Sequence, residues 1–341
     1  MNNALLSVRR LCIHYQTRGD WPWQTSPVAK AVNGIDFDLH AGQTLGVAGE
    51  SGCGKSTLAR ALVGLQPVTS GSIRLAGQEP TRLNKMGWRK LRRQVQMVFQ
   101  DPYASLDPRM TIGESIAEPL ANLYPELPWM ERRRQVLEII EKVGLSGRYS
   151  QRYPHELSGG QCQRVGIARA VVVKPKILIC DEPVSALDVS IQAQIINLLK
   201  DLQADMKLAM IFISHNLSVV RHVSHEVLIM YLGKVMEHAT REQLFERTGH
   251  PYTRALLSAV PISDSDREGV HRRIVLRGEL PSPASPPSGC VFRTRCPWAA
   301  ERCAREIPAL RRFGSTHAIA CHYAGKLAGI LDEFTSGCRG S

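Results

Sequence analysis

The sequence lacks any long hydrophobic run. Nothing in its 341 residues approaches the ~20 consecutive apolar residues that a membrane-spanning helix needs. The best candidate, residues 171–180, is interrupted by Lys174 and Lys176. A secretory signal is not expected either, because Arg9 and Arg10 follow only a few apolar residues. We therefore expect a chain that is made in the cytoplasm and stays there.

The sequence also lacks internal repeats, a polybasic tail and an acidic excess. With 43% hydrophobic and 22% charged residues it falls in the range of globular proteins, which excludes disorder and collagen-like architecture. The 43 Lys and Arg outnumber the 31 Asp and Glu, giving a formal charge of +12. Such a charge fits nucleic acid, an anionic membrane or nucleotide phosphates, although its spread along the chain favours solvated helix faces. Nine cysteines in a cytoplasmic chain argue against disulfides and favour metal binding or buried thiols.

Hydrophobic patterning predicts strands that alternate with helices, which indicates a mainly parallel α/β sheet. We expect strands at 4–15, 35–39, 43–48, 177–180 and 208–213, helices at 55–63, 131–143 and 191–202, and a hairpin at 227–237. The composition changes after about residue 260. A proline-rich linker at 281–287 leads into a tail of about 50 residues that holds five of the nine cysteines.

The strongest motif is a phosphate-binding loop between the strand at 43–48 and the helix at 55–63. Its glycines allow backbone N–H groups to form an anion nest, to which the helix N-terminus adds its positive dipole end. In this pattern the lysine reaches the β- and γ-phosphates, the serine after it binds Mg²⁺, and the next threonine contacts a phosphate oxygen. The residues predicted to bind ATP here are Gly49, Ser51, Gly52, Cys53, Gly54, Lys55, Ser56 and Thr57. We expect the Cys53 thiol either near the nucleotide or buried and inert.

An acidic pair completes the predicted chemistry. Asp181 and Glu182 follow the apolar strand 177–180. Asp181 is expected to hold Mg²⁺ through water beside the phosphate loop, and Glu182 to act as the general base on the attacking water.

A third motif, residues 157–161 (Leu-Ser-Gly-Gly-Gln), opens a helix between the other two motifs. Here the chain resembles the ATP-binding-cassette (ABC) ATPases over residues 4–260. The resemblance implies an α/β fold of the ABC type, with an antiparallel β subdomain, a helical signature subdomain at about 101–172 and a small Cys-rich C-terminal extension. It divides the chain into a nucleotide-binding domain, 1–260, and an extension, 261–341.

The resemblance also assigns site residues. Ser158, Gly160 and Gln161 would act on the ATP of a second subunit. Gln100 would sense Mg²⁺ and the γ-phosphate, so that Ser56, Gln100 and Asp181 form the Mg²⁺ set. His215 would be the switch histidine at the γ-phosphate, and Tyr15 would stack on adenine. Glu182, His215 and Gln100 are thus the expected catalytic residues.

The tail resembles the C-terminal extension of the oligopeptide/dipeptide importer ATPases in residues 250–257, 278–283 and 289–292, a pattern that nickel importers share in part. Cys290, Cys296, Cys303 and Cys321 have the spacing C-x5-C-x6-C-x17-C. Four thiolates suit a [4Fe–4S] cluster, whereas three with His317 or His322 suit zinc, and unligated thiols are a further alternative.

These resemblances imply the ATP-binding subunit of a bacterial ABC importer for di- or oligopeptides. The expected partners are a second ATPase subunit, which the resemblance favours as a paralog, two transmembrane permeases and an extracytoplasmic substrate-binding protein. The expected location is the cytoplasmic face of the inner membrane. A nickel-chelate or glutathione importer is the alternative. A nucleic-acid ATPase is disfavoured because no long coiled coil interrupts the cassette, and no nucleic-acid partner is expected. A soluble phosphate-loop kinase has no use for residues 157–161.

Overall fold

The chain folds into two β-sheets with helices packed around them. The computed structural model describes residues 4–16, 28–80, 85–260, 274–314 and 316–325. The strands are β1 (Leu6–Gln16), β2 (Val28–Leu39), β3 (Thr44–Ala48), β4 (Ser70–Leu75), β5 (Val95–Val98), β6 (Ile177–Asp181), β7 (Ala209–Ser214), β8 (Glu226–Tyr231), β9 (Lys234–Thr240), β10 (Arg311–Phe313) and β11 (His317–Ile319).

The main sheet has the strand order β10-β11-β9-β8-β3-β7-β6-β5. Its centre is parallel: β3 pairs with β7 and β8, and β6 pairs with β5 and β7. β3, β6 and β7 are buried along their whole length, as expected for strands covered on both faces. Their carboxyl ends lie at one edge of the sheet, where parallel α/β sheets place their ligands.

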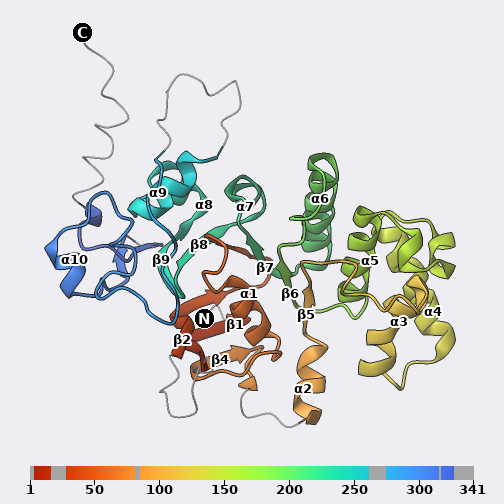
Figure 1. Ribbon diagram of the computed structural model, residues 1–341. Helices are drawn as coiled ribbons and strands as arrows, with labels where there is room; N and C mark the ends of the chain where they lie inside the picture. The colour runs from red at the N-terminus through yellow and green to blue at the C-terminus, as the bar shows by residue number, and fades with distance from the viewer. Residues whose placement is uncertain (1–3, 17–27, 81–84, 261–273, 315, 326–341) are drawn as a thin grey trace, which may run out of the picture.

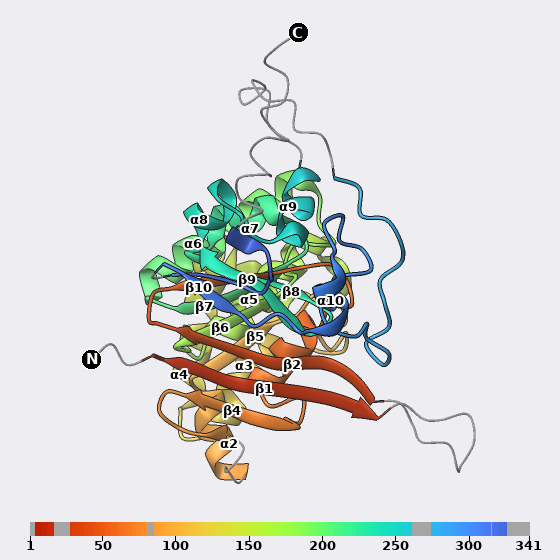
Figure 2. The same cartoon turned by 90° about the vertical axis from the view of Figure 1, so that its left-hand side faces the viewer.

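The smaller sheet is antiparallel, with the order β2-β1-β4. Figure 2 shows it as a separate layer beneath the main sheet. The helix α1 (Lys55–Leu62) shares one hydrophobic cluster with both sheets, through Leu58 and Leu62 of the helix, Leu6 of β1 and Val47 of β3. This packing fixes the N-terminal end of α1 where β3 ends.

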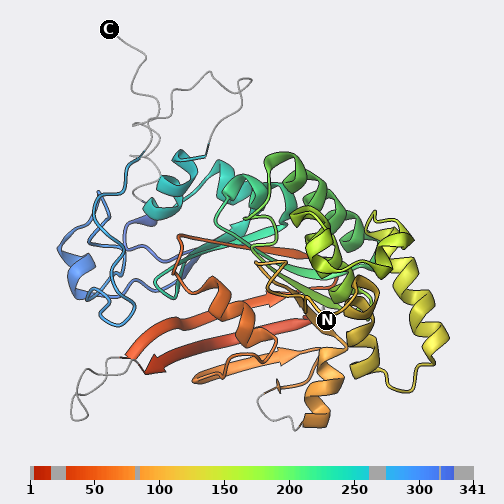
Figure 3. The same cartoon turned by 45° about the vertical axis from the view of Figure 1, so that its right-hand side comes forward.

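Further helices follow α1 along the described chain. They are α2 (Lys85–Arg92), α3 (Ile112–Leu123), α4 (Trp129–Lys142), α5 (Gly159–Val171), α6 (Val189–Met206), α7 (Leu217–Val223), α8 (Arg241–Glu246), α9 (Pro251–Ser258) and α10 (Glu301–Arg305). Figures 1 and 3 show α3, α4 and α5 grouped at one end of the molecule and α10 at the opposite end. Of the helices in the described ranges, none combines the length and the apolar character that crossing a membrane requires.

The C-terminal extension packs onto β8 and β9 instead of forming a separate body. β11 continues the main sheet through antiparallel pairing of Ala318 with His238 and of Ile319 with Glu237. The predicted linker 281–287 contacts β2, where the Lys30 N–H donates to the Pro283 carbonyl over 3.2 Å. Phe292 of the extension, Tyr231 of β8 and Tyr252 of α9 share a third hydrophobic cluster.

Every element predicted from periodicity is confirmed. The helix expected at 131–143 is α4, and Gly144 follows it with a φ of 76°, as a glycine cap requires. The predicted hairpin is the antiparallel pair β8–β9. Residues 17–27 and Cys338 lie outside the described residues.

Candidate functional site

The phosphate-loop motif forms the turn from β3 into α1. Gly49, Gly52 and Gly54 all have positive φ, at 151°, 79° and 104°. A Cβ on Gly49 would lie 2.2 Å from the Met230 carbonyl oxygen, and one on Gly54 only 2.0 Å from that of Ala31. Both positions therefore require glycine for space as well as for backbone conformation.

Lys55 is the first residue of α1 and is only 4% exposed. Its ammonium Nζ donates to the carbonyl oxygens of Gly49 (2.7 Å) and Glu50 (2.9 Å). Ser51 and Gly52 are exposed at the tip of the loop, and Thr57 is half-buried in the first turn of α1. The predicted phosphate-binding residues thus occupy one loop and the helix turn that follows it.

Two of the side chains predicted to bind Mg²⁺ lie beside this loop. The Ser56 Oγ donates to Asp181 Oδ1 over 2.9 Å, although the two residues are 125 positions apart. Asp181 ends β6 and is 3% exposed. Burial raises the pKa of Asp181, an effect that the hydrogen bond from Ser56 opposes. A hydroxyl and a buried carboxylate supply the oxygen ligands that Mg²⁺ prefers, so these residues fit the predicted ion.

Three predicted catalytic side chains meet at one oxygen. Glu182 Oε2 lies 3.3 Å from Gln100 Nε2 and 3.3 Å from His215 Nδ1. The Glu182 backbone has a φ of 47°, an uncommon conformation for a side-chain-bearing residue, and its N–H donates to the Ile213 carbonyl. The chain therefore fixes this carboxylate one residue beyond Asp181, between the ends of β5 and β7.

The signature motif lies at the start of α5. Ser158 is the N-cap: its Oγ accepts from the Gln161 N–H, and the Gln161 Oε1 accepts from the Ser158 N–H. A Cβ on Gly160 would lie 2.6 Å from the Ile191 Cγ2, so α5 and α6 pack closely there. Figure 1 shows α5 in the helical group, apart from α1. This placement suits action on a phosphate outside the chain's own loop.

Tyr15 lies near the end of β1, opposite Ala29 of β2, with about a third of its surface exposed.

The Cys53 side chain follows the second of its two expected placements, burial, and not exposure near the nucleotide. Its thiol is 1% exposed and faces Lys55 Nζ at 3.7 Å, and burial raises its pKa. The structure thus gives the buried alternative, in which Cys53 contributes its backbone to the loop rather than a reactive side chain.

Sequence reasoning missed Tyr103. Its hydroxyl donates to the Leu157 carbonyl over 3.0 Å and so joins the segment after Gln100 to the residue before the signature serine. An aromatic residue three positions after Gln100 was the only signal for this contact in the sequence.

Two family models match the chain: "ABC transporter" at residues 32–185 and "Oligopeptide/dipeptide transporter, C-terminal region" at residues 236–303. The oligopeptide transport ATP-binding protein OppF of Escherichia coli (strain K12) is 53% identical over 321 residues, which cover 93% of this chain and 96% of that protein. The chain belongs to the oligopeptide/dipeptide family of ABC-transporter ATP-binding proteins.

Another relative in this ABC ATPase family is the di/tripeptide transport ATP-binding protein DppF of Pseudomonas aeruginosa (strain UCBPP-PA14). It is 51% identical, over 96% of this chain and 99% of that protein. A dimeric post-hydrolysis structure of the ATP-binding cassette MJ0796, bound to ADP and Pi, aligns with a TM-score of 0.62 and 26% identity over 69% of this chain and 98% of its own. The predicted ABC-ATPase fold and the assignment as an ATPase are confirmed.

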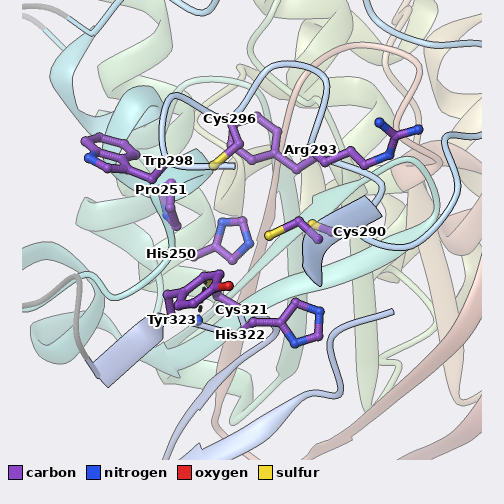
Figure 4. A pocket seen from close by; sticks show the side chains of 11 residues that line it. His250, Pro251, Cys290, Arg293, Cys296, Trp298, Cys321, His322 and Tyr323 are labelled. Carbon is purple, nitrogen blue, oxygen red and sulfur yellow. Dashed lines mark hydrogen bonds between the residues drawn. The ribbon is translucent and has the colours of Figure 1, made fainter. Parts of the chain in front are cut away.

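The four predicted cluster cysteines of this ABC ATPase line one small pocket in the extension, as Figure 4 shows for Cys290, Cys296 and Cys321. Cys303 lines the same pocket, and its carbonyl accepts from the Cys290 N–H over 2.8 Å. Burial raises the pKa of Cys296 to about 12 and that of Cys321 to about 11. These thiols hold their protons at neutral pH, and a metal would have to displace them.

The residues proposed as zinc ligands are placed less favourably. Within the described ranges, no three His, Cys, Asp or Glu side chains converge as ligands of a single ion. His317 does not line the pocket; its Nε2 lies 2.7 Å from Glu237 Oε1. His322 does line it, with its Nε2 3.0 Å from the Glu306 carbonyl. His250, which was not among the predicted ligands, projects into the pocket in Figure 4, and its Nδ1 accepts from the Tyr252 N–H.

Proposed function

We propose that this chain is the ATP-hydrolysing subunit of a bacterial ABC importer for di- and oligopeptides. The observation that carries the hydrolytic part is the approach of Gln100 and His215 to the Glu182 carboxylate, next to the Ser56–Asp181 pair. The peptide substrate is supported by the family and by relatives that carry oligopeptide and di/tripeptide names. Neither the OppF nor the DppF relative carries a nickel or glutathione name.

In the proposed mechanism, the amides of residues 49–54 and the Lys55 ammonium hold the β- and γ-phosphates of ATP. Ser56 and Asp181 would hold Mg²⁺, with Gln100 nearby, and the ion would neutralise charge that develops on the phosphates. Glu182 accepts a proton from the attacking water. Gln100 and His215, both within 3.3 Å of its Oε2, orient that carboxylate and the water. Tyr15 stacks on the adenine base.

The rest of the assembly follows from the signature. Ser158, Gly160 and Gln161 would complete the γ-phosphate site of a second ATPase subunit, which we propose to be a paralog. The helical subdomain at about 101–172 would pass the closure of the pair to two permeases at the cytoplasmic face of the inner membrane. An extracytoplasmic protein would deliver the peptide. Residues 1–260 would form the nucleotide-binding domain and 261–341 the extension.

The test of the hydrolytic assignment is Glu182→Gln in the assembled transporter. The amide keeps the shape of the side chain but cannot accept the proton, so ATP should still bind while turnover falls about 10²–10⁴-fold. Glu138→Gln, on the exposed part of α4, is the matched control and should retain full turnover. Near-normal ATP hydrolysis by the Glu182→Gln assembly would refute the general-base role.

We further propose that Cys290, Cys296, Cys303 and Cys321 bind a [4Fe–4S] cluster that stabilises the extension. Support comes from their chemistry, since four thiols around one pocket are the donor set of such a cluster. A [4Fe–4S] cluster binds each thiolate through a different iron, so it does not require the four sulfurs to meet at one ion, as zinc would.

Anaerobic purification tests this cluster. The protein should be brown and contain about four iron and four sulfide per chain. Serine at any one of the four positions should remove the colour, whereas Cys338→Ser, outside the cluster spacing, should keep it. A colourless, active protein with one zinc per chain would contradict the cluster.

A further inference from the structure

An ion pair joins the C-terminal extension directly to the phosphate loop. Arg295 donates through both terminal nitrogens to the Glu50 carboxylate, with Nη1 2.5 Å from Oε2 and Nη2 3.1 Å from Oε1. The two side chains are 10% and 27% exposed, so the pair is largely shielded from water. Glu50 is the second residue of the phosphate loop, and Arg295 lies 245 positions later, between two of the pocket cysteines.

The backbone of Glu50 is held by α9, which lies before the extension and packs against it. The Tyr252 hydroxyl accepts from the Glu50 N–H over 2.8 Å. Tyr252 packs edge-on against Tyr231, with 4.9 Å between the ring centroids, and both rings contact Phe292 at 5.3 Å. Arg295 lies over the Tyr231 ring, 6.0 Å from its centroid. The aromatic cluster therefore fixes the positions of the Tyr252 hydroxyl and the Arg295 guanidinium, the two groups that bind Glu50.

Three groups of Glu50 are thus fixed at once. Tyr252 receives its N–H, Arg295 binds its carboxylate, and its carbonyl accepts from Lys55 Nζ. The carbonyl links Glu50 to the lysine that must reach the phosphates. A shift of Glu50 would therefore change where the Lys55 ammonium and the loop amides point.

We propose that Arg295 is a positioning residue of the ATPase site, through which the C-terminal extension holds the phosphate loop in its ATP-binding shape. Arg295 acts through Glu50, whose carboxylate it binds. Cys296 follows Arg295, and Cys290 and Phe292 precede it closely, all three lining the thiol pocket. The arrangement of that pocket consequently sets the position of Arg295 and, with it, the affinity of the loop for ATP.

The test is a double-mutant cycle on the purified full-length chain. Arg295→Ala and Glu50→Gln should each raise the Kd for a fluorescent ATP analogue about tenfold, and the double variant should bind no more weakly than either single one. In the assembled transporter KM for ATP should rise with kcat nearly unchanged, because the ion pair touches none of the residues around the attacking water. Arg295→Lys, which keeps the charge without the two-pronged geometry, should recover part of the affinity.

Arg305→Ala is the matched control. Arg305 is also an arginine of the extension in an ion pair, here with Glu301, but both side chains are exposed. It should leave the Kd for the ATP analogue unchanged. Thermal unfolding and free-thiol counts would show whether Arg295→Ala merely disrupts the pocket; Glu50→Gln, which leaves the extension unaltered, must then still weaken binding. Additive effects of the two substitutions, or unchanged Kd in Glu50→Gln, would overturn the proposal.

Discussion

Glu226 of β8 and His238 of β9 form a partly buried pair, with His238 Nε2 3.1 Å from Glu226 Oε2. The hydrogen bond from His238 is the largest influence on Glu226 and lowers its pKa. Because the carboxyl pKa is lower in the folded chain than in the unfolded one, the pair stabilises the fold above the ordinary carboxyl pKa. That stabilisation is lost as pH falls through the folded-state pKa.

We therefore expect Glu226→Gln to lower the free energy of unfolding by about 1 kcal/mol at pH 7, and by progressively less below pH ~4.5. Urea unfolding between pH 3.5 and 7 measures this difference. Glu301→Gln, in an exposed pair with Arg305, is the control and should change stability by under ~0.5 kcal/mol. A Glu226→Gln deficit that stays constant across this range would contradict the assignment.

At the scale of the elements, the N-cap residue of α5 has two roles that mutations can separate. Ser158 caps the helix, and the same hydroxyl is the proposed ligand for a partner's γ-phosphate. Ser158→Ala should lower stability by about 1 kcal/mol through loss of the cap. Ser158→Asp should keep the cap, because aspartate is a favourable N-cap residue, while its negative charge repels phosphate.

Stability and turnover together distinguish the two tasks. Thermal unfolding of the purified chain should place Ser158→Asp close to the wild type and above Ser158→Ala. ATP hydrolysis by the assembled transporter should fall at least tenfold in Ser158→Asp. If the capped variant hydrolyses ATP normally, the hydroxyl is only a helix cap.

Elements with a strong period were predictable, and weakly patterned ones were not. The buried strands β3, β6 and β7 read as apolar runs, and α4 as a periodic helix with a glycine after it. β5 has four residues and includes Gln96, and β10 and β11 have three residues each, so none forms a readable pattern. α3 contains Pro119, which argues against a helix from sequence although the capping box of Thr111 and Glu114 starts one.

The site divides in the same way. Lys55, Asp181 and Glu182 were predictable because each lies in a local motif with a chemical reason. The contact between Arg295 and Glu50 joins positions 245 residues apart, and nothing in the sequence around either residue points to the other. The packing of the extension against β8 and α9, with Phe292 at its centre, brings those positions together.

At the scale of the whole molecule, the cluster around Phe292 makes the extension part of the cassette. Phe292 is 1% exposed and contacts Tyr231, Tyr252 and His250. Phe292→Ala should lower the free energy of unfolding by about 3–5 kcal/mol, because it leaves a cavity between the extension and the nucleotide-binding part. Phe292→Leu should lower it by less. Urea unfolding monitored by both intrinsic fluorescence and circular dichroism measures the loss.

The wild type should unfold in one transition by both probes, since its parts share a core. In Phe292→Ala the two probes should report separate unfolding transitions, because the extension should unfold before the rest of the chain. Coincident transitions and a loss below ~1 kcal/mol would mean that Phe292 is not the joint between the two parts.

The strand order of the main sheet has a consequence for association between molecules. β9 would be an open edge, with unpaired N–H and C=O groups, if β11 did not pair with it. Among the described strands the new edge is β10, which is three residues long, exposed at each position and carries Arg311 and Arg312. A short strand with two adjacent positive charges is a poor template for another chain, so the extension also protects the ATPase against edge-to-edge aggregation.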